Sequence, residues 1–107
     1  MPWLLLVVAG LLEVVWALAL KSSEGFSKLA PTALFAVAVV ASMALLSLAL
    51  RDLPVGTGYA VWTGIGAVGA ALAGIVLLGE AASLARLLPI ALIAVGIVWL
   101  ALGESAA

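Results

Sequence analysis

The sequence predicts an all-α membrane protein with four transmembrane helices. Of its 107 residues, 68% are hydrophobic and only 8% are charged, whereas a water-soluble domain is about half apolar and a quarter charged. The charged residues gather in short hydrophilic segments, and the apolar stretches between them have the length of about 20 residues that crosses a bilayer. We therefore expect a single transmembrane domain over 1–107, with helices at about 3–20, 30–50, 55–78 and 84–102.

The first two spans have recognisable ends. The span at about 3–20 is followed by Lys21 and the polar run Ser-Ser-Glu-Gly25. Its start lacks a basic segment, so we expect it to remain as a span and not to be cleaved as a signal peptide. The span at about 30–50 has Pro31 in its first turn, where a proline is tolerated, and it ends before Arg51-Asp-Leu-Pro54.

The last two spans contain helix-packing and helix-bending signals. In the span at about 55–78, Gly66, Ala70 and Gly74 are each four residues apart, which is a close-packing pattern for helices in lipid. Ser83 is a candidate N-cap for the span at about 84–102. Pro89 inside that span is expected to bend the helix or to mark a late start.

Composition excludes several classes of function. A formal net charge of -1 provides no basic surface for nucleic acid. The chain has no Cys and no His, so disulfides, zinc sites and Cys or His catalysis are excluded. We expect no enzyme activity, no cofactor and no metal, and proton chemistry must fall to carboxylates, Lys or Tyr.

The charges of the connections specify the orientation only weakly. An even number of spans puts both termini on one side with Arg51, whereas Lys21, Lys28 and Arg86 lie on the other side. The side with more Lys and Arg normally faces the cytoplasm, so this bias favours both termini outside. The same small bias is compatible with insertion in both orientations.

Glu13 is the one charged residue inside a predicted span, close to the bilayer midplane. A central charge costs about 3 kcal/mol on insertion scales, which the surrounding Leu and Val residues offset. Structural hydrogen bonding to another helix is one interpretation. Because an intramembrane acid usually marks a functional site, we favour a role in binding protons or a cation.

Further polar and aromatic residues accompany Glu13 at membrane depth. Trp16 lies on the same helix face as Glu13, three residues on. The second span contributes Ser42, and the third contributes Tyr59 and Trp62, which share a face. Gly64 and Gly66 would let helix backbones approach or bend there. We interpret Tyr59 and Trp62 as walls of a pocket, although membrane-interface anchoring is the alternative.

Two copies of the chain would make a better cation site than one. A residue at the midplane keeps its depth when the chain is inverted, so an antiparallel homodimer would bring two Glu13 carboxylates to one level. Trp16 and Trp62 lie about 7 Å from the midplane on opposite sides. Inversion would therefore place Trp16 of one chain level with Trp62 of the other.

These residues resemble those of the small multidrug resistance family along essentially the whole chain. The matching segments are Gly10-Leu-Leu-Glu13-Val-Val-Trp16-Ala-Leu-Ala-Leu-Lys21, Ser23-Glu-Gly25-Phe26, Leu53-Pro54-Val-Gly56 and Tyr59-Ala-Val-Trp62-Thr-Gly64-Ile-Gly66. Trp16 makes the chain similar to the guanidinium exporter subtype, since the quaternary-ammonium subtype typically has Gly there.

The resemblance implies an antiparallel, dual-topology homodimer in the cell membrane that exports guanidinium and small guanidinyl cations in exchange for protons. It implies that Glu13 of both subunits binds protons or the cation alternately. It also implies that Trp16, Ser42, Tyr59 and Trp62 line the site and hold the glutamates by hydrogen bonds. The alternatives are a proton-coupled exporter of quaternary ammonium and hydrophobic cations, and a membrane subunit that does not transport.

Overall fold

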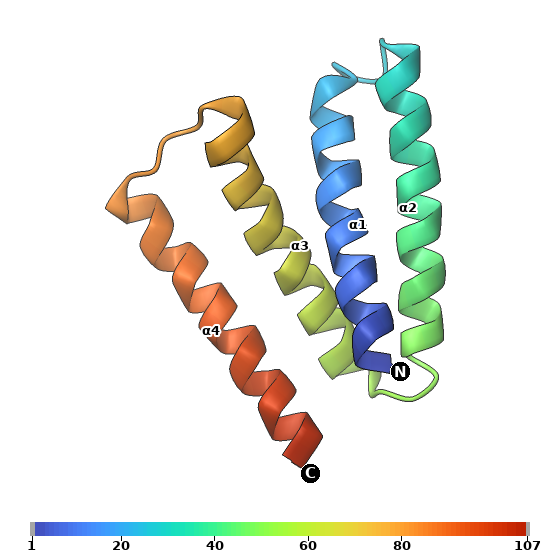
Figure 1. Cartoon of the computed structure of the whole chain (residues 1–107), viewed down its shortest axis with the longest axis vertical. Helices are drawn as coiled ribbons and strands as arrows, with labels where there is room; N and C mark the ends of the chain where they lie inside the picture. The colour runs from blue at the N-terminus through green and yellow to red at the C-terminus, as the bar shows by residue number, and fades with distance from the viewer. Residues whose placement is uncertain (1, 107) are drawn as a thin grey trace.

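The computed structural model describes residues 2–106, which form four helices. They are α1 (Pro2–Ser22), α2 (Leu29–Ala49), α3 (Val55–Leu78) and α4 (Leu84–Ala106). All four are long and apolar enough to cross a membrane, which confirms the predicted all-helical membrane class. Both termini lie at the end of the molecule that holds the α2–α3 connection, as an even number of spans requires (Figure 1).

The observed helix limits differ from the predicted ones mainly at α1 and α4. The α1 helix continues to Ser22, and the α4 helix extends through Glu104 to Ala106. Pro89 does not mark a late start, because α4 begins at Leu84 and passes through it. A proline inside a helix removes its own N–H from the hydrogen-bond ladder, and its ring crowds the carbonyl four residues earlier, here that of Ala85. The carbonyl of Ser83 accepts bonds from the N–H groups of Arg86 and Leu87, at 3.0 and 2.9 Å.

The helices form an open fan and do not close into a bundle. Figure 1 shows them side by side in the order α2, α1, α3, α4, and the Cα extents are 45 × 34 × 16 Å. Within the described chain, α4 contacts α3 and neither α1 nor α2. One chain therefore encloses very little interior.

A small apolar core joins the first three helices toward the end that holds the termini. Its members come in pairs, Leu6 and Ala9 from α1, Leu46 and Ala49 from α2, and Val61 and Trp62 from α3. Small residues at Ala9 and Ala49 let the backbones approach, which is how helices pack in lipid. None of the α4 side chains that the structure describes is buried.

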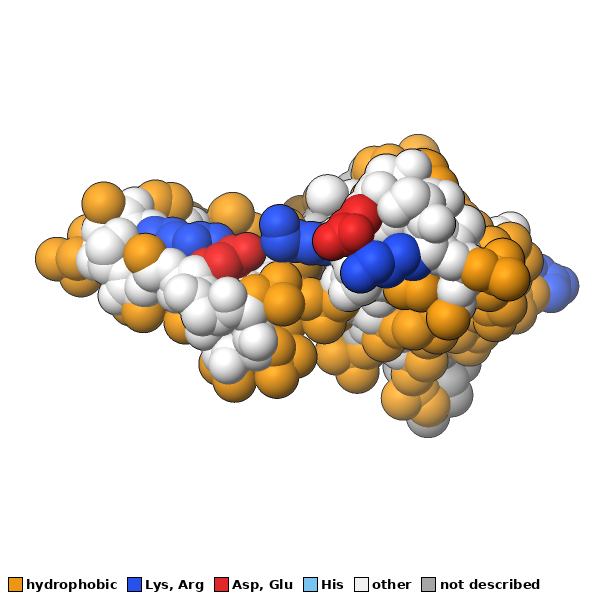
Figure 2. All heavy atoms as spheres, turned by 90° about the horizontal axis from the view of Figure 1, so that it is seen from above, with side chains coloured by type: hydrophobic (Ala, Val, Ile, Leu, Met, Phe, Trp, Pro, Cys, Tyr) orange, Lys and Arg blue, Asp and Glu red, His pale blue; other side chains and the backbone are white. Residues whose placement is uncertain are grey.

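Apart from Glu13, the charged side chains lie at the two ends of the fan. Figure 2 looks onto the end with the α1–α2 and α3–α4 connections, where basic and acidic side chains lie among polar surface while hydrophobic side chains cover the flanks. Lys28 and Glu24 form an ion pair at 3.4 Å, and Arg86 pairs with Glu80. This distribution fits a protein whose flanks face lipid.

Candidate functional site

Glu13 lies in the middle of α1, and its side chain contacts α3. Gly66 of α3 faces its side chain, and a Cβ built on Gly66 would lie 2.6 Å from Cγ of Glu13 and closer still to the carboxyl group. Any other residue at position 66 would therefore displace the acid. The glycine provides the space that Glu13 occupies between the two helices.

One oxygen of Glu13 has no partner. Its Oε1 atom is buried and makes no hydrogen bond to any residue that the structure describes. A buried polar atom without a partner costs about 1–3 kcal/mol, and more when it is charged. Such exceptions are uncommon in native proteins and need an explanation. The acid is thus placed to accept a proton or a hydrogen-bond donor that the described residues of this single chain do not supply.

Trp16 lies one turn further along α1 and packs toward α2. Its ring meets the ring of Phe35 edge to face, with centroids 5.8 Å apart and an interplanar angle of 83°. The indole Nε1 is buried and lacks an acceptor among residues 2–106. Two unsatisfied polar atoms, an acceptor and a donor, therefore occur within one turn of the same helix.

Ser42 and Trp62 form a separate hydrogen-bonded group. The indole Nε1 of Trp62 donates to Oγ of Ser42 at 3.0 Å, and that hydroxyl donates to the carbonyl of Ala9 at 2.7 Å. Ser42 is fully buried and Trp62 is 3% exposed. Because the Ala9 carbonyl lies four residues before Glu13, this group connects α2 and α3 to the helical turn that carries the acid.

Tyr59 extends this group toward the surface. Its ring lies 5.3 Å from the ring of Trp62, tilted by 52°, and the residue is 52% exposed. Tyr59, Trp62 and Ser42 are thus connected in sequence, from the surface inward. The hydrogen bonds of Ser42 and Trp62 lead to each other and to Ala9, and the structure does not join them to the Glu13 carboxyl group.

The glycines of α3 face both neighbouring helices. A Cβ at Gly64 would meet Ile97 of α4, whereas Gly66 faces Glu13 and Gly69 faces Val14, both on α1. Sequence reasoning missed Gly69, because the stripe of residues four apart does not include it.

The predicted packing stripe of Gly66, Ala70 and Gly74 does not lie against one neighbouring element along its length. A Cβ at Gly74 would meet the carboxyl of Glu80 in the connection after α3. The two ends of the stripe therefore face different parts of the chain, because α3 diverges from α1 toward its C-terminal end (Figure 1).

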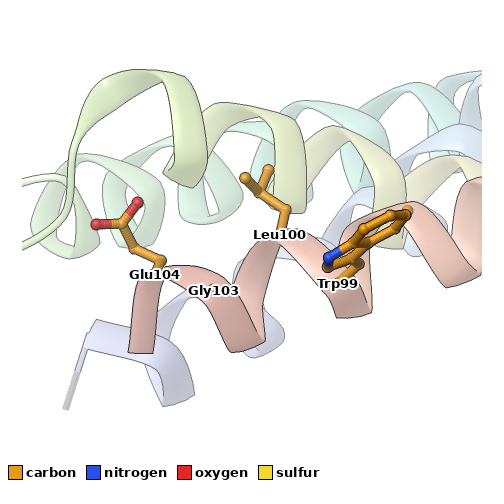
Figure 3. A pocket seen from close by; sticks show the side chains of 5 residues that line it. Trp99, Leu100, Gly103 and Glu104 are labelled. Atoms are coloured by element: carbon orange, nitrogen blue, oxygen red, sulfur yellow. The ribbon is translucent and has the colours of Figure 1, made fainter. Parts of the chain in front are cut away.

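Two further features lie away from Glu13. Thr57 of α3 donates from its hydroxyl to Glu104 of α4 at 2.8 Å, a contact that the sequence alone did not indicate. A groove of about 490 Å³ follows the last turns of α4, and its lining residues do not include a predicted site residue (Figure 3). They are Gly96, Trp99, Leu100, Gly103 and Glu104. Among the described residues, no cluster of carboxylates could hold a metal ion.

The chain is similar to known proteins along nearly its whole length. The sequence profile described as Small Multidrug Resistance protein matches residues 1–93. A guanidinium exporter of Yersinia pseudotuberculosis is 61% identical over 104 residues, which are 97% of this chain and 100% of that protein. Guanidinium exporters of Salmonella typhimurium and Escherichia coli are 62% and 61% identical over 102 residues, covering 95% of this chain and 97% of each relative.

Proposed function

The chain belongs to the small multidrug resistance family as a multi-pass protein of the plasma membrane, and on this premise we propose that it exports guanidinium ions in exchange for protons. The relatives named above are exporters and not enzymes. The observation that carries the proposal is the Glu13 carboxyl group, which lies mid-span with a buried oxygen that has no partner in the described chain.

Guanidinium suits this acid chemically. The ion is planar and carries a fork of N–H donors whose spacing matches the two oxygens of a carboxylate. Indole and phenol rings attract a planar cation over their faces, and Trp16, Tyr59 and Trp62 offer such rings. The bulk of Trp16 beside the acid favours a small cation over a large aromatic one.

The working unit in this proposal is an antiparallel homodimer. A fan with no buried residue in the described part of α4 leaves much apolar surface open for a second copy. Inversion of that copy keeps Glu13 at the midplane, so two carboxylates share one site. The unpaired Nε1 of Trp16 then has carboxylate oxygens of the partner subunit as candidate acceptors.

Exchange follows from competition for the same carboxylates. Protons enter from the outside and neutralise the two Glu13 side chains, and the loaded dimer changes its facing. Internal guanidinium then displaces the protons and is carried out on the return step. If the site cannot hold protons and the cation together, the two fluxes are obligatorily coupled.

The proposal is tested by guanidinium-driven proton flux in sealed liposomes containing the purified chain. We expect flux from the wild type and none from Glu13→Gln, which removes the ionisable group with little change in volume. Glu24→Gln is the matched control, because Glu24 lies exposed in the α1–α2 connection, and it should transport normally. Coupled flux by Glu13→Gln would contradict the assignment. Flux driven by a quaternary ammonium cation and not by guanidinium would favour a multidrug exporter.

A further inference from the structure

The turn between α1 and α2 is linked to Trp16 through two successive ring contacts. Phe26 in the turn packs against Phe35 of α2, with ring centroids 5.5 Å apart and an angle of 60°. Phe35 in turn meets Trp16 at 5.8 Å. Edge-to-face pairs of this kind are favourable beyond the area that they bury. Phe26, which lies outside the membrane span, is thereby connected through Phe35 to the indole ring of Trp16.

The backbone of the turn holds Phe26 in an unusual conformation. Glu24, Gly25 and Phe26 have φ angles of 48°, 71° and 68°, a region that side chains with a Cβ rarely adopt. Ser23, which is fully buried, accepts a hydrogen bond from the N–H of Phe26 at 3.1 Å and donates to the carbonyl of Leu20 at 2.7 Å. These bonds tie the strained turn to the end of α1, and so they fix the position of the Phe26 ring.

Within one chain, Trp16 depends on packing for its orientation. Its only polar atom, Nε1, makes no hydrogen bond to the described residues. Van der Waals contacts with neighbouring side chains therefore hold the ring in that chain, and Phe35 is the aromatic residue among these neighbours. If Phe35 moves, no hydrogen bond within residues 2–106 would keep the indole in place.

We propose that Phe35, and through it Phe26, are positioning residues that set the orientation of the Trp16 indole and so restrict the site to small planar cations. In this proposal, the turn formed by Ser23-Glu-Gly-Phe26 holds the Phe26 ring against Phe35 of α2. This inference rests on the proposed function, since it places Trp16 at the cation site.

The test uses Phe35→Leu and Phe26→Leu, which remove each ring but keep an apolar side chain. Phe26→Tyr is the matched control, because Phe26 is half exposed and a hydroxyl there reaches water. The first readout is the indole N–H resonance of Trp16 in isotope-labelled protein, identified by its loss in Trp16→Phe. The second is the ratio of transport rates for guanidinium and for a benzyl-substituted guanidinium in liposomes.

We expect both Leu variants to shift the Trp16 resonance and to lower the preference for guanidinium by about two- to twelve-fold, the range that corresponds to one aromatic pair. Phe26→Tyr should keep both wild-type values. A Phe26→Leu variant with an unchanged resonance and an unchanged ratio would overturn the inference. Wild-type liposomes measured in parallel separate the two proposals. Absence of guanidinium transport by the wild type would contradict the proposed export function. The Trp16 N–H resonance would still test whether Phe35 and Phe26 position the indole.

Discussion

Replacing Gly66 with alanine tests how tightly α3 encloses the Glu13 carboxyl group. The added Cβ would lie 2.6 Å from Cγ of Glu13, whereas ordinary contact begins at 3.4 Å. The Cγ atom must therefore move by at least about 0.8 Å, the difference between these distances, and the carboxyl group must move further because it lies closer to the added Cβ. Overpacking of this size costs about 1–3 kcal/mol. If this cost falls on the cation-bound state, the guanidinium concentration for half-maximal flux should rise about 5- to 150-fold.

The assay is guanidinium-driven proton flux across liposomes as a function of guanidinium concentration, together with thermal unfolding of the purified protein. Gly56→Ala is the matched control on the same helix, since a Cβ there meets nothing within 4 Å. That control should leave transport unchanged and should slightly stabilise α3, because alanine favours the helix over glycine by about 1 kcal/mol. Wild-type flux and wild-type unfolding in Gly66→Ala would refute the close approach of Gly66 to the acid.

A double-mutant cycle separates the acid from the rest of the interface. Glu13→Asp shortens the side chain by one methylene group and withdraws the carboxyl group from α3. Combined with Gly66→Ala, it should lose less unfolding free energy than the sum of the two single variants, by about 0.5–3 kcal/mol. Strict additivity would mean that the alanine methyl meets something other than Glu13.

Two more substitutions address the remaining site residues. Ser42→Ala removes the acceptor of the Trp62 N–H and leaves that buried donor unpaired. Thermal unfolding should therefore show a loss of about 1–3 kcal/mol in the free energy of unfolding. An unchanged unfolding midpoint would show that the Trp62–Ser42 hydrogen bond does not contribute to stability. Trp16→Gly removes the indole beside Glu13 and should allow larger hydrophobic cations to compete with guanidinium in the liposome assay. An unchanged substrate profile in this variant would place Trp16 outside the cation site.

The contacts of the α3 glycines show which part of the helix packing a sequence pattern can predict. A stripe of small residues at intervals of four predicts that α3 has a close-packing face, and Gly66 does lie against α1. The same pattern also contains Gly74, which faces Glu80 and not α1, and it omits Gly69, which faces Val14 of α1. Because α3 crosses α1 at an angle and diverges from it (Figure 1), a straight stripe cannot follow the neighbouring helix along its full length.

The sequence by itself determined the four spans and the single intramembrane acid. Both depend on local properties, namely the length of each apolar run and the cost of a charge in hydrocarbon. Charge and composition likewise excluded nucleic-acid binding and His or Cys chemistry without any knowledge of contacts.

Only the tertiary structure decided which side chains meet. It placed Gly66 against Glu13, turned Trp16 toward Phe35, and joined Trp62 and Ser42 to the carbonyl of Ala9. The physical reason is that lipid is as apolar as a protein interior, so every face of a membrane helix can be apolar and the pattern does not mark the packed face. Helix rotation and crossing angle, which set these contacts, depend on the complementary shapes of residues far apart in the chain.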